Sequence, residues 1–292
     1  MDEAALPVVL EVCVDSVESA MSAIRGGADR LELCANLGYG GGITPSFGLL
    51  KAVSDLLSYT QILVMIRPRM GDFVYSEEEI TVMLEDIRVF KQYGVRGIVA
   101  GALTAEGRID VECMKRLVDE ALPHEVCFHR AFDMTRNLDE ALQDIASIGG
   151  ISRILTSGHG PTAPSSLEVL KKLFQARKEL VGNDPWVLSI LPGSGINGEN
   201  VTSLLEALIP LGLKEIHLSG GTWVDGAMSF RREGMGMGFG KAEWNVWRTQ
   251  EDKIRQVRYA VDTHAQERAS LYPVAPIVLE DMPTVVENIG SG

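Results

Sequence analysis

The sequence predicts an α/β fold, a single-domain (β/α)8 TIM-type barrel, from three observations. Eight short runs rich in apolar and β-branched residues recur along the chain, and an amphipathic stretch follows almost every one. The runs are spaced by roughly thirty residues, the length of one βα unit. Glycines lie where several of the amphipathic stretches should end. A doubly wound open sheet is the alternative, but such sheets seldom contain eight units of this regularity.

The expected strands are the apolar runs themselves. They are Val8–Val14, Arg30–Cys34, Gln61–Arg67, Gly97–Gly101, Glu125–Arg130, Ser152–Thr156, Trp186–Leu191 and Glu215–Ser219. Between them, apolar residues recur at intervals of three and four, as in amphipathic helices. Ser76 and Asn137, each followed three residues later by Glu, are expected to begin two of these helices.

A last helix is expected over about Glu251–Val261, after a loop that follows the eighth strand. We assign residues 1–267 to the barrel domain. Residues 268–292, which contain three prolines, are expected to form a C-terminal tail extension and not a second domain.

Composition and charge narrow the classes of function. The chain has 292 residues, with 27 Lys and Arg against 40 Asp and Glu, and this acidic balance argues against nucleic acid or membrane partners. No apolar stretch approaches the roughly 18 residues of a membrane helix, and the N-terminus lacks the basic start of a secretory signal. The four cysteines never occur as C-x-x-C and are expected to be reduced thiols. We therefore expect a cytoplasmic protein, with the nucleus as a second compartment.

Strand alternation predicts which side chains point into the barrel. In the first run Val8, Leu10, Val12 and Val14 form the outward set, so Glu11 and Cys13 should point inward. The same reasoning places a polar and thiol-bearing set inside: Glu32, Cys34, Arg67, Cys127, His129 and His217. Buried carboxylates need partners. The set is either a salt-bridge network in which Arg67 neutralises Glu11 or Glu32, or a functional site at the carboxyl ends of the strands.

Two thiols lie where they can share a metal ion. Cys13 and Cys34 fall near the carboxyl ends of adjacent strands and share the inward parity. Neighbouring strands are about 4.8 Å apart, and thiolates select Cu(I) or Zn among biological metals. The alternative is that these cysteines are small buried hydrophobic residues without a function.

The chain resembles the CutC copper homeostasis family. The resemblance is carried by eight blocks in order: EVCVDSVESA (11–20), GGADRLELC (26–34), GGITPS (41–46), the stretch from Val64 to Ser76, GALTAEGRID (101–110), FHRAFDM (128–134), RILTSG (153–158) and PGSGIN (192–197). Together they extend over most of the chain, and an ordered series of this kind is far more specific than any single motif.

The resemblance implies a (β/α)8 barrel, in agreement with the periodicity. It also implies a cytosolic location (nuclear as well in some animals) and a part in copper homeostasis through Cu(I) binding. Cys13 and Cys34 match the family's Cu(I) thiols, so copper is the expected cofactor and partner.

Two glycine-rich turns predict a second site. Gly193 and Gly195 follow the seventh expected strand, and Gly220 and Gly221 follow the eighth. Loops at these places in barrels often bind phosphate through backbone N–H groups. The alternative is that these glycines only allow tight turns.

Combined with the inward polar residues, these turns suggest an alternative function. The chain would be an enzyme, an isomerase, aldolase or lyase acting on a phosphorylated small molecule. Glu11, Glu32, Arg67 and His129 would then be the catalytic residues, with His129 or a carboxylate as general base and Arg67 as electrostatic stabiliser. The sequence leaves open whether the protein is an enzyme.

The loop before the last helix is rich in Gly, Met and Trp. It contains three methionines, Met228, Met235 and Met237, whose thioethers are able to bind soft copper. The alternative is that they only form part of a flexible loop that closes over the barrel mouth. The three tryptophans of this region either cover a hydrophobic edge or form a contact in a homo-oligomer. They are Trp223, Trp244 and Trp247.

Overall fold

Eight parallel strands form the centre of the protein in a computed structural model, which describes residues 8–56, 61–184 and 186–271. The strands are β1 (Val9–Val14), β2 (Arg30–Leu33), β3 (Gln61–Met65), β4 (Gly97–Ala100), β5 (Glu125–Phe128), β6 (Ile151–Thr156), β7 (Ser189–Pro192) and β8 (Glu215–Leu218). Their hydrogen-bonded order is β7-β6-β5-β4-β3-β2-β1-β8. A parallel bridge between Gly193 and His217 links β7 to β8 and closes the ring. The fold is therefore the predicted (β/α)8 barrel and not an open sheet.

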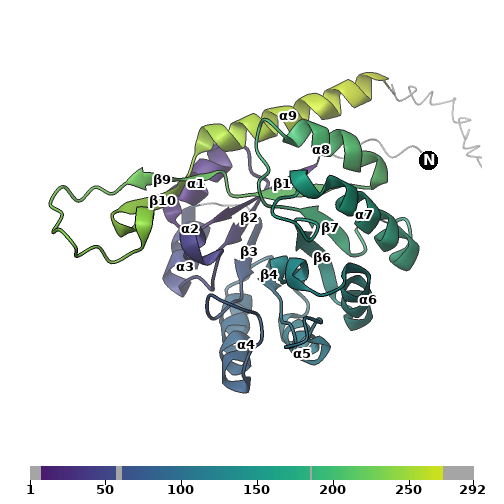
Figure 1. The fold of residues 1–292 in the computed structure, drawn as a ribbon, viewed down its shortest axis with the longest axis horizontal. Helices are drawn as coiled ribbons and strands as arrows, with labels where there is room; N and C mark the ends of the chain where they lie inside the picture. Colours follow the sequence, from purple (N-terminus) through teal and green to yellow (C-terminus); the bar gives the residue numbers. More distant parts are fainter. Residues whose placement is uncertain (1–7, 57–60, 185, 272–292) are drawn as a thin grey trace, which may run out of the picture.

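Helices surround this ring, as Figure 1 shows. They are α1 (Val17–Arg25), α2 (Leu37–Gly40), α3 (Phe47–Leu56), α4 (Glu77–Gln92), α5 (Val111–Ala121), α6 (Leu138–Ile148), α7 (Leu167–Val181), α8 (Val201–Leu208) and α9 (Glu251–Leu271). The predicted helix starts are confirmed: Ser76 and Glu79 form a capping box before α4, and the Asn137 side chain accepts the Glu140 N–H before α6.

Two hydrophobic cores lie on opposite faces of the strands. Outward residues such as Leu10, Val12 and Val64 pack under the helices in one large cluster. A separate cluster fills the inside of the barrel and consists of Cys13, Cys34, Leu63, Met65, Val99, Cys127, Leu155 and Leu191. The predicted alternation is thereby confirmed, and the three inward thiols lie inside the barrel.

Two element boundaries differ most from the prediction. β7 begins at Ser189 and not at Trp186, because Trp186 and Val187 are exposed and lie outside the strand. The last helix, α9, continues to Leu271 and so crosses the expected start of the tail at residue 268. The remainder of the predicted tail, residues 272–292, lies outside the described residues.

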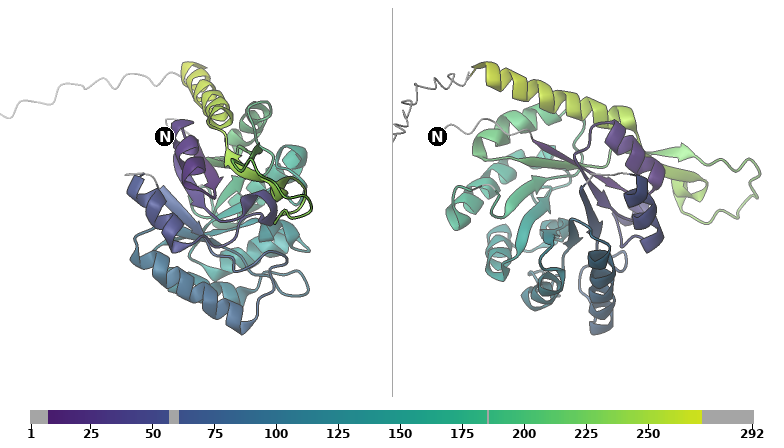
Figure 2. Two further views of the ribbon diagram at one scale, coloured as in Figure 1. Left: turned by 90° about the vertical axis from the view of Figure 1, so that its left-hand side faces the viewer. Right: turned by 180° about the vertical axis from the view of Figure 1, so that it is seen from behind.

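An antiparallel hairpin, which the sequence did not predict, stands between β8 and α9. It consists of β9 (Gly221–Asp225) and β10 (Asn245–Thr249) and extends away from the barrel, as the right-hand view of Figure 2 shows. At its base the rings of Trp223 and Trp247 meet edge to face with centroids 5.5 Å apart. These two tryptophans therefore pack within the chain, and a homo-oligomer stays a prediction.

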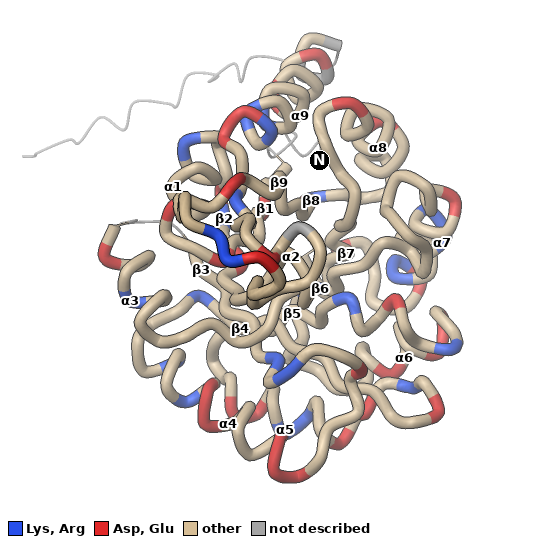
Figure 3. The backbone as a smooth tube through the Cα atoms, turned by 60° about the vertical axis from the view of Figure 1, so that its left-hand side comes forward, with Lys and Arg blue, Asp and Glu red and all other residues tan. Residues whose placement is uncertain are grey.

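Charged residues lie mainly on the outer helices and loops, where acidic and basic positions are interspersed (Figure 3). Surface ion pairs such as Arg116 with Glu77 connect neighbouring helices. Among the described helices, none has the length and apolar character that a membrane span requires.

Candidate metal and small-molecule site in the barrel

A buried ion network crosses the interior of the barrel. The Arg30 guanidinium pairs with both Glu11 and Glu215, and Arg153 pairs with Glu125 at 2.7 Å. Glu11 and Arg30 are partners in the β1–β2 register, which places the two charges side by side. The predicted network therefore exists, but Arg30, and not Arg67, neutralises Glu11. Burial alone would raise the pKa of Glu11, but Arg30 and His217 outweigh burial and hold this pKa far below its usual value.

Arg67 has a different role, because it lies past the end of β3. Its guanidinium donates to three backbone carbonyls, those of Gly40 at 2.7 Å and of Gly42 and Gly71 at 3.0 Å. Its Cζ also lies 4.9 Å from the centre of the Phe73 ring. Within the described chain Arg67 pairs with no carboxylate, so its positive charge is not neutralised by Glu11 or Glu32.

His217 brings β8 into the site. Its Nδ1 lies 2.7 Å from Glu11 Oε1, and Cys13, Glu32 and His217 each offer a ligand atom within 4.8 Å of the other two. All three residues are buried. The sequence placed His217 inside the barrel but did not assign it to the site. The signal was its inward parity in the strand that pairs with β1 when the barrel closes.

The second predicted thiol contacts the same carboxylate. Cys34 Sγ lies 3.3 Å from Glu32 Oε1, whereas Glu32 Oε2 is buried and has no hydrogen-bond partner among the described residues. Burial raises the pKa of Glu32, of Cys13 and, together with the charge of Glu32, of Cys34. The pKa of His217 is raised well above its usual value, because the Glu32 carboxylate and the hydrogen bond to Glu11 outweigh the effect of burial. Because the pKa values of Cys13 and Cys34 are raised above the usual value of a thiol, both thiols are protonated at neutral pH.

His129 is held as a neutral imidazole. Its Nδ1 accepts the N–H of Ala131 at 3.2 Å, so the ring proton lies on Nε2, which is buried and finds no hydrogen-bond partner in the part of the chain that the structure describes. Burial first, and the charge of Arg67 second, lower the pKa of His129 to about 3. A group with this pKa is a weak base at neutral pH, and its Nε2–H is suited to donating a hydrogen bond.

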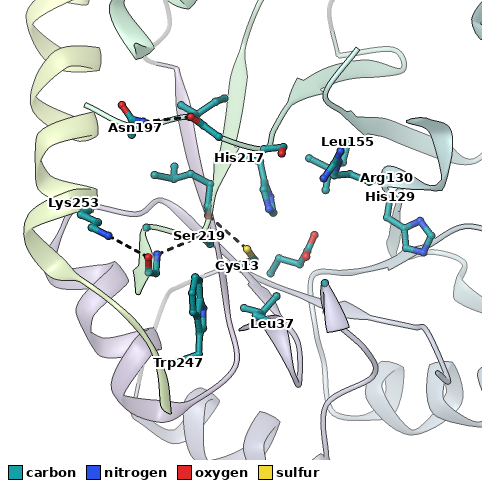
Figure 4. Close-up of a pocket in the computed structure, with 18 of the residues that line it drawn as sticks. Cys13, Leu37, His129, Arg130, Leu155, Asn197, His217, Ser219, Trp247 and Lys253 are labelled. Carbon is teal, nitrogen blue, oxygen red and sulfur yellow. Dashed lines mark hydrogen bonds between the residues drawn. The ribbon is translucent and has the colours of Figure 1, made fainter. Parts of the chain in front are cut away.

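A cavity of about 600 Å³ opens at the carboxyl ends of the strands and connects these groups. Cys13, Glu32, Arg67, His129 and His217 all line it. Figure 4 shows Lys253 and Trp247 on one side of the cavity, His129 on the other, and Cys13 and His217 between them. Cys34 and Glu11 do not line the cavity but contact residues that do.

The predicted anion-binding glycines separate into two groups. Gly195, Gly220 and Gly221 line the cavity. Gly193 does not, and its N–H already donates to the Thr156 carbonyl at 2.9 Å, so it is not available to an anion. A side chain on Gly220 would meet Ile254, and one on Gly221 would meet Trp247. Close packing is therefore sufficient to explain these two glycines.

Fold and site together define a class: (β/α)8 barrels with thiol, carboxylate and imidazole groups gathered at the carboxyl ends of the strands. The CutC family model matches residues 8–222, and the chain belongs to the CutC family. It is 42% identical to the copper homeostasis protein cutC homologs of Homo sapiens and Mus musculus, over 85% of this chain and 86% and 87% of theirs.

Solved structures agree with this assignment. The structure of a putative copper homeostasis protein CutC from Streptococcus agalactiae is 27% identical, with a TM-score of 0.65, over 73% of this chain and 98% of that one. A Rubisco-like protein from Rhodopseudomonas palustris has a TM-score of 0.54 at 14% identity over 88% of this chain and 64% of that one, which shows a shared barrel fold alone.

Proposed function

We propose that this protein acts in copper homeostasis and binds Cu(I) inside the barrel through Cys13 and Cys34. The observation that carries the proposal is the position of Glu32. Its carboxylate belongs to the cluster with Cys13 and His217, whose ligand atoms lie within 4.8 Å of one another, and it contacts Cys34 Sγ at 3.3 Å. One carboxylate thus joins both thiols and an imidazole.

The chemistry of these donors suits a soft ion. Thiolates bind Cu(I) strongly and imidazole binds copper well, whereas carboxylates suit harder cations. Cys13 and Cys34 would supply thiolates, and His217 would supply a nitrogen, oriented by the hydrogen bond of its Nδ1 to Glu11. Glu32 contacts Cys34 and lines the cavity, so it would take up the proton that leaves Cys34 when the metal binds and pass it on to solvent.

The relatives support this role by their names, since both mammalian homologs are called copper homeostasis proteins. We place the protein in the cytoplasm, with the nucleus as a second compartment. All four cysteines are free and buried, and free thiols persist in a reducing compartment.

The test is a competition titration with a Cu(I) chelator under anaerobic, reducing conditions. The variant Cys13→Ser/Cys34→Ser should bind Cu(I) at least about a hundredfold more weakly, a loss of about 2.7 kcal/mol. The matched control is Cys113→Ser/Cys127→Ser, which also removes two buried thiols but leaves the proposed ligands in place. Equal Cu(I) affinities of the two double variants would disprove the assignment.

A further inference from the structure

The cavity is much larger than one metal ion requires. Its volume of about 600 Å³ lies within the range of about 300–1,000 Å³ that small-molecule sites occupy. Cys13 lies in its middle, and the proposed Cu(I) site does not use the end that is formed by Arg67, Phe73 and His129.

Two buried N–H groups at that end have no hydrogen-bond acceptor in the described chain. They are His129 Nε2–H and Arg67 Nε–H. His129 is 4% exposed and Arg67 is 7% exposed, and both side chains line the cavity. Both also contact the Phe73 ring, with His129 at 5.0 Å between ring centres and the Arg67 Cζ at 4.9 Å. Buried polar groups are as a rule hydrogen-bonded, so two such donors side by side call for an acceptor.

The charge at this end of the cavity is positive. Within the described residues Arg67 donates only to the carbonyls of Gly40, Gly42 and Gly71, which are neutral. His129 is a neutral donor, because its Nδ1 accepts the Ala131 N–H and its one ring proton lies on Nε2. A ligand that accepts from Arg67 Nε–H and His129 Nε2–H must carry acceptor oxygens, and one that also neutralises the buried guanidinium must carry a negative charge.

We propose that this cavity binds a small organic oxyanion, a carboxylate or a phosphate ester, through Arg67 and His129. One oxygen of the anion accepts from Arg67 Nε–H and a second from His129 Nε2–H, an arrangement for which guanidinium and imidazole donors are well suited. The body of the ligand lies against Met65 and Leu155, which line the same cavity, and extends toward Cys13.

Calorimetric titration of the metal-free protein with glycolate and, separately, with ethyl phosphate tests the proposal. Saturable binding of at least one probe is expected, and the tighter of the two identifies the acid group. The variant His129→Asn retains the cap on the Ala131 N–H, because Asn is a good capping residue, but it lacks a donor at the Nε2 position. It should bind the probe about tenfold more weakly, as expected for one lost hydrogen bond to a charged group.

The matched control is His159→Asn. His159 has a positive φ of 57°, which Asn tolerates, and it does not line the cavity. Its probe affinity should equal that of the wild type. Arg67→Lys, which keeps the charge but removes the Nε–H, is a second variant that should also weaken binding. The proposal is wrong if neither probe binds, or if His129→Asn and Arg67→Lys both bind the probe as tightly as the control. Because no copper is present, the outcome is independent of the Cu(I) test.

Discussion

His217 donates a 2.7 Å hydrogen bond from Nδ1 to Glu11, its register partner on the neighbouring strand β1. The other oxygen of Glu11 pairs with Arg30. The carboxylate therefore fixes both the tautomer and the direction of the imidazole and leaves Nε2 for Cys13 and Glu32. Closure of the barrel creates this contact, since the two residues are more than two hundred positions apart in the chain.

Replacement of Glu11 by Gln should destabilise the fold strongly. The amide keeps the shape of the side chain but leaves Arg30 short of one negative charge inside the barrel. Removal of one partner from a buried ion pair costs about 3–5 kcal/mol. Urea denaturation monitored by circular dichroism measures this change in the free energy of unfolding.

The control for this variant is Glu168→Gln. Glu168 pairs with Lys171 on the surface of α7, and its side chain is 80% exposed. Its loss should change the free energy of unfolding by less than about 1 kcal/mol. Similar values for the two variants would mean that the buried network does not stabilise the barrel.

Binding of Cu(I) should release protons and strengthen as the pH rises. Burial raises the pKa of Cys13 and of Cys34 above the usual value of a thiol, so both are protonated at neutral pH and must lose a proton to bind the metal. The two thiols alone release two protons, so the apparent association constant should rise at least about a hundredfold per pH unit between about pH 6 and pH 8. Chelator competition at several pH values measures this slope.

Calorimetry in buffers of different ionisation enthalpy counts the same protons directly. Because the pKa of His217 is also raised, a third released proton would indicate that its imidazole binds the metal as well. Affinity that is independent of pH would contradict binding through protonated thiols.

The sequence was sufficient to predict the fold and the inward set, because both follow from local periodicity. Alternation in β1, for example, correctly placed Glu11 and Cys13 inside the barrel, opposite Val12 and Val14. Local patterns also gave the caps at Ser76 and Asn137.

Pairing between inward residues could not be predicted, since it depends on strand register and on position along the barrel axis. Arg30 and Arg67 both have inward parity, but only Arg30 lies beside Glu11, whereas Arg67 lies beyond the end of β3 and contacts loop carbonyls. The cluster of Cys13, Glu32 and His217 likewise requires the ring to close between its first and last strands.

His129 should make stability depend on pH in the mildly acidic range. Its pKa is lowered from 6.5 to about 3 in the folded protein. Between these values the unfolded chain binds a proton that the folded protein does not, so stability falls as the pH decreases, by about 1.4 kcal/mol per unit. Urea denaturation of wild type and His129→Asn over this range should show a smaller slope for the variant.

His217 cannot produce the same slope. Its pKa is raised in the folded protein, so its contribution is fully present below 6.5 and is lost only as the pH rises above that value. Identical slopes for wild type and His129→Asn below this pH would show that His129 is not held neutral.

Gly221 is required because Trp247 packs directly against its backbone. A Cβ at this position would overlap the indole ring, which also lines the cavity. Gly221→Ala should therefore destabilise the protein by about 1–3 kcal/mol, the usual cost of overpacking. In a Trp247→Leu background the same substitution should cost much less, because the smaller side chain leaves room for the methyl group. A double-mutant cycle on the free energy of unfolding measures the coupling, and additive effects would mean that the indole is not what excludes a side chain at Gly221.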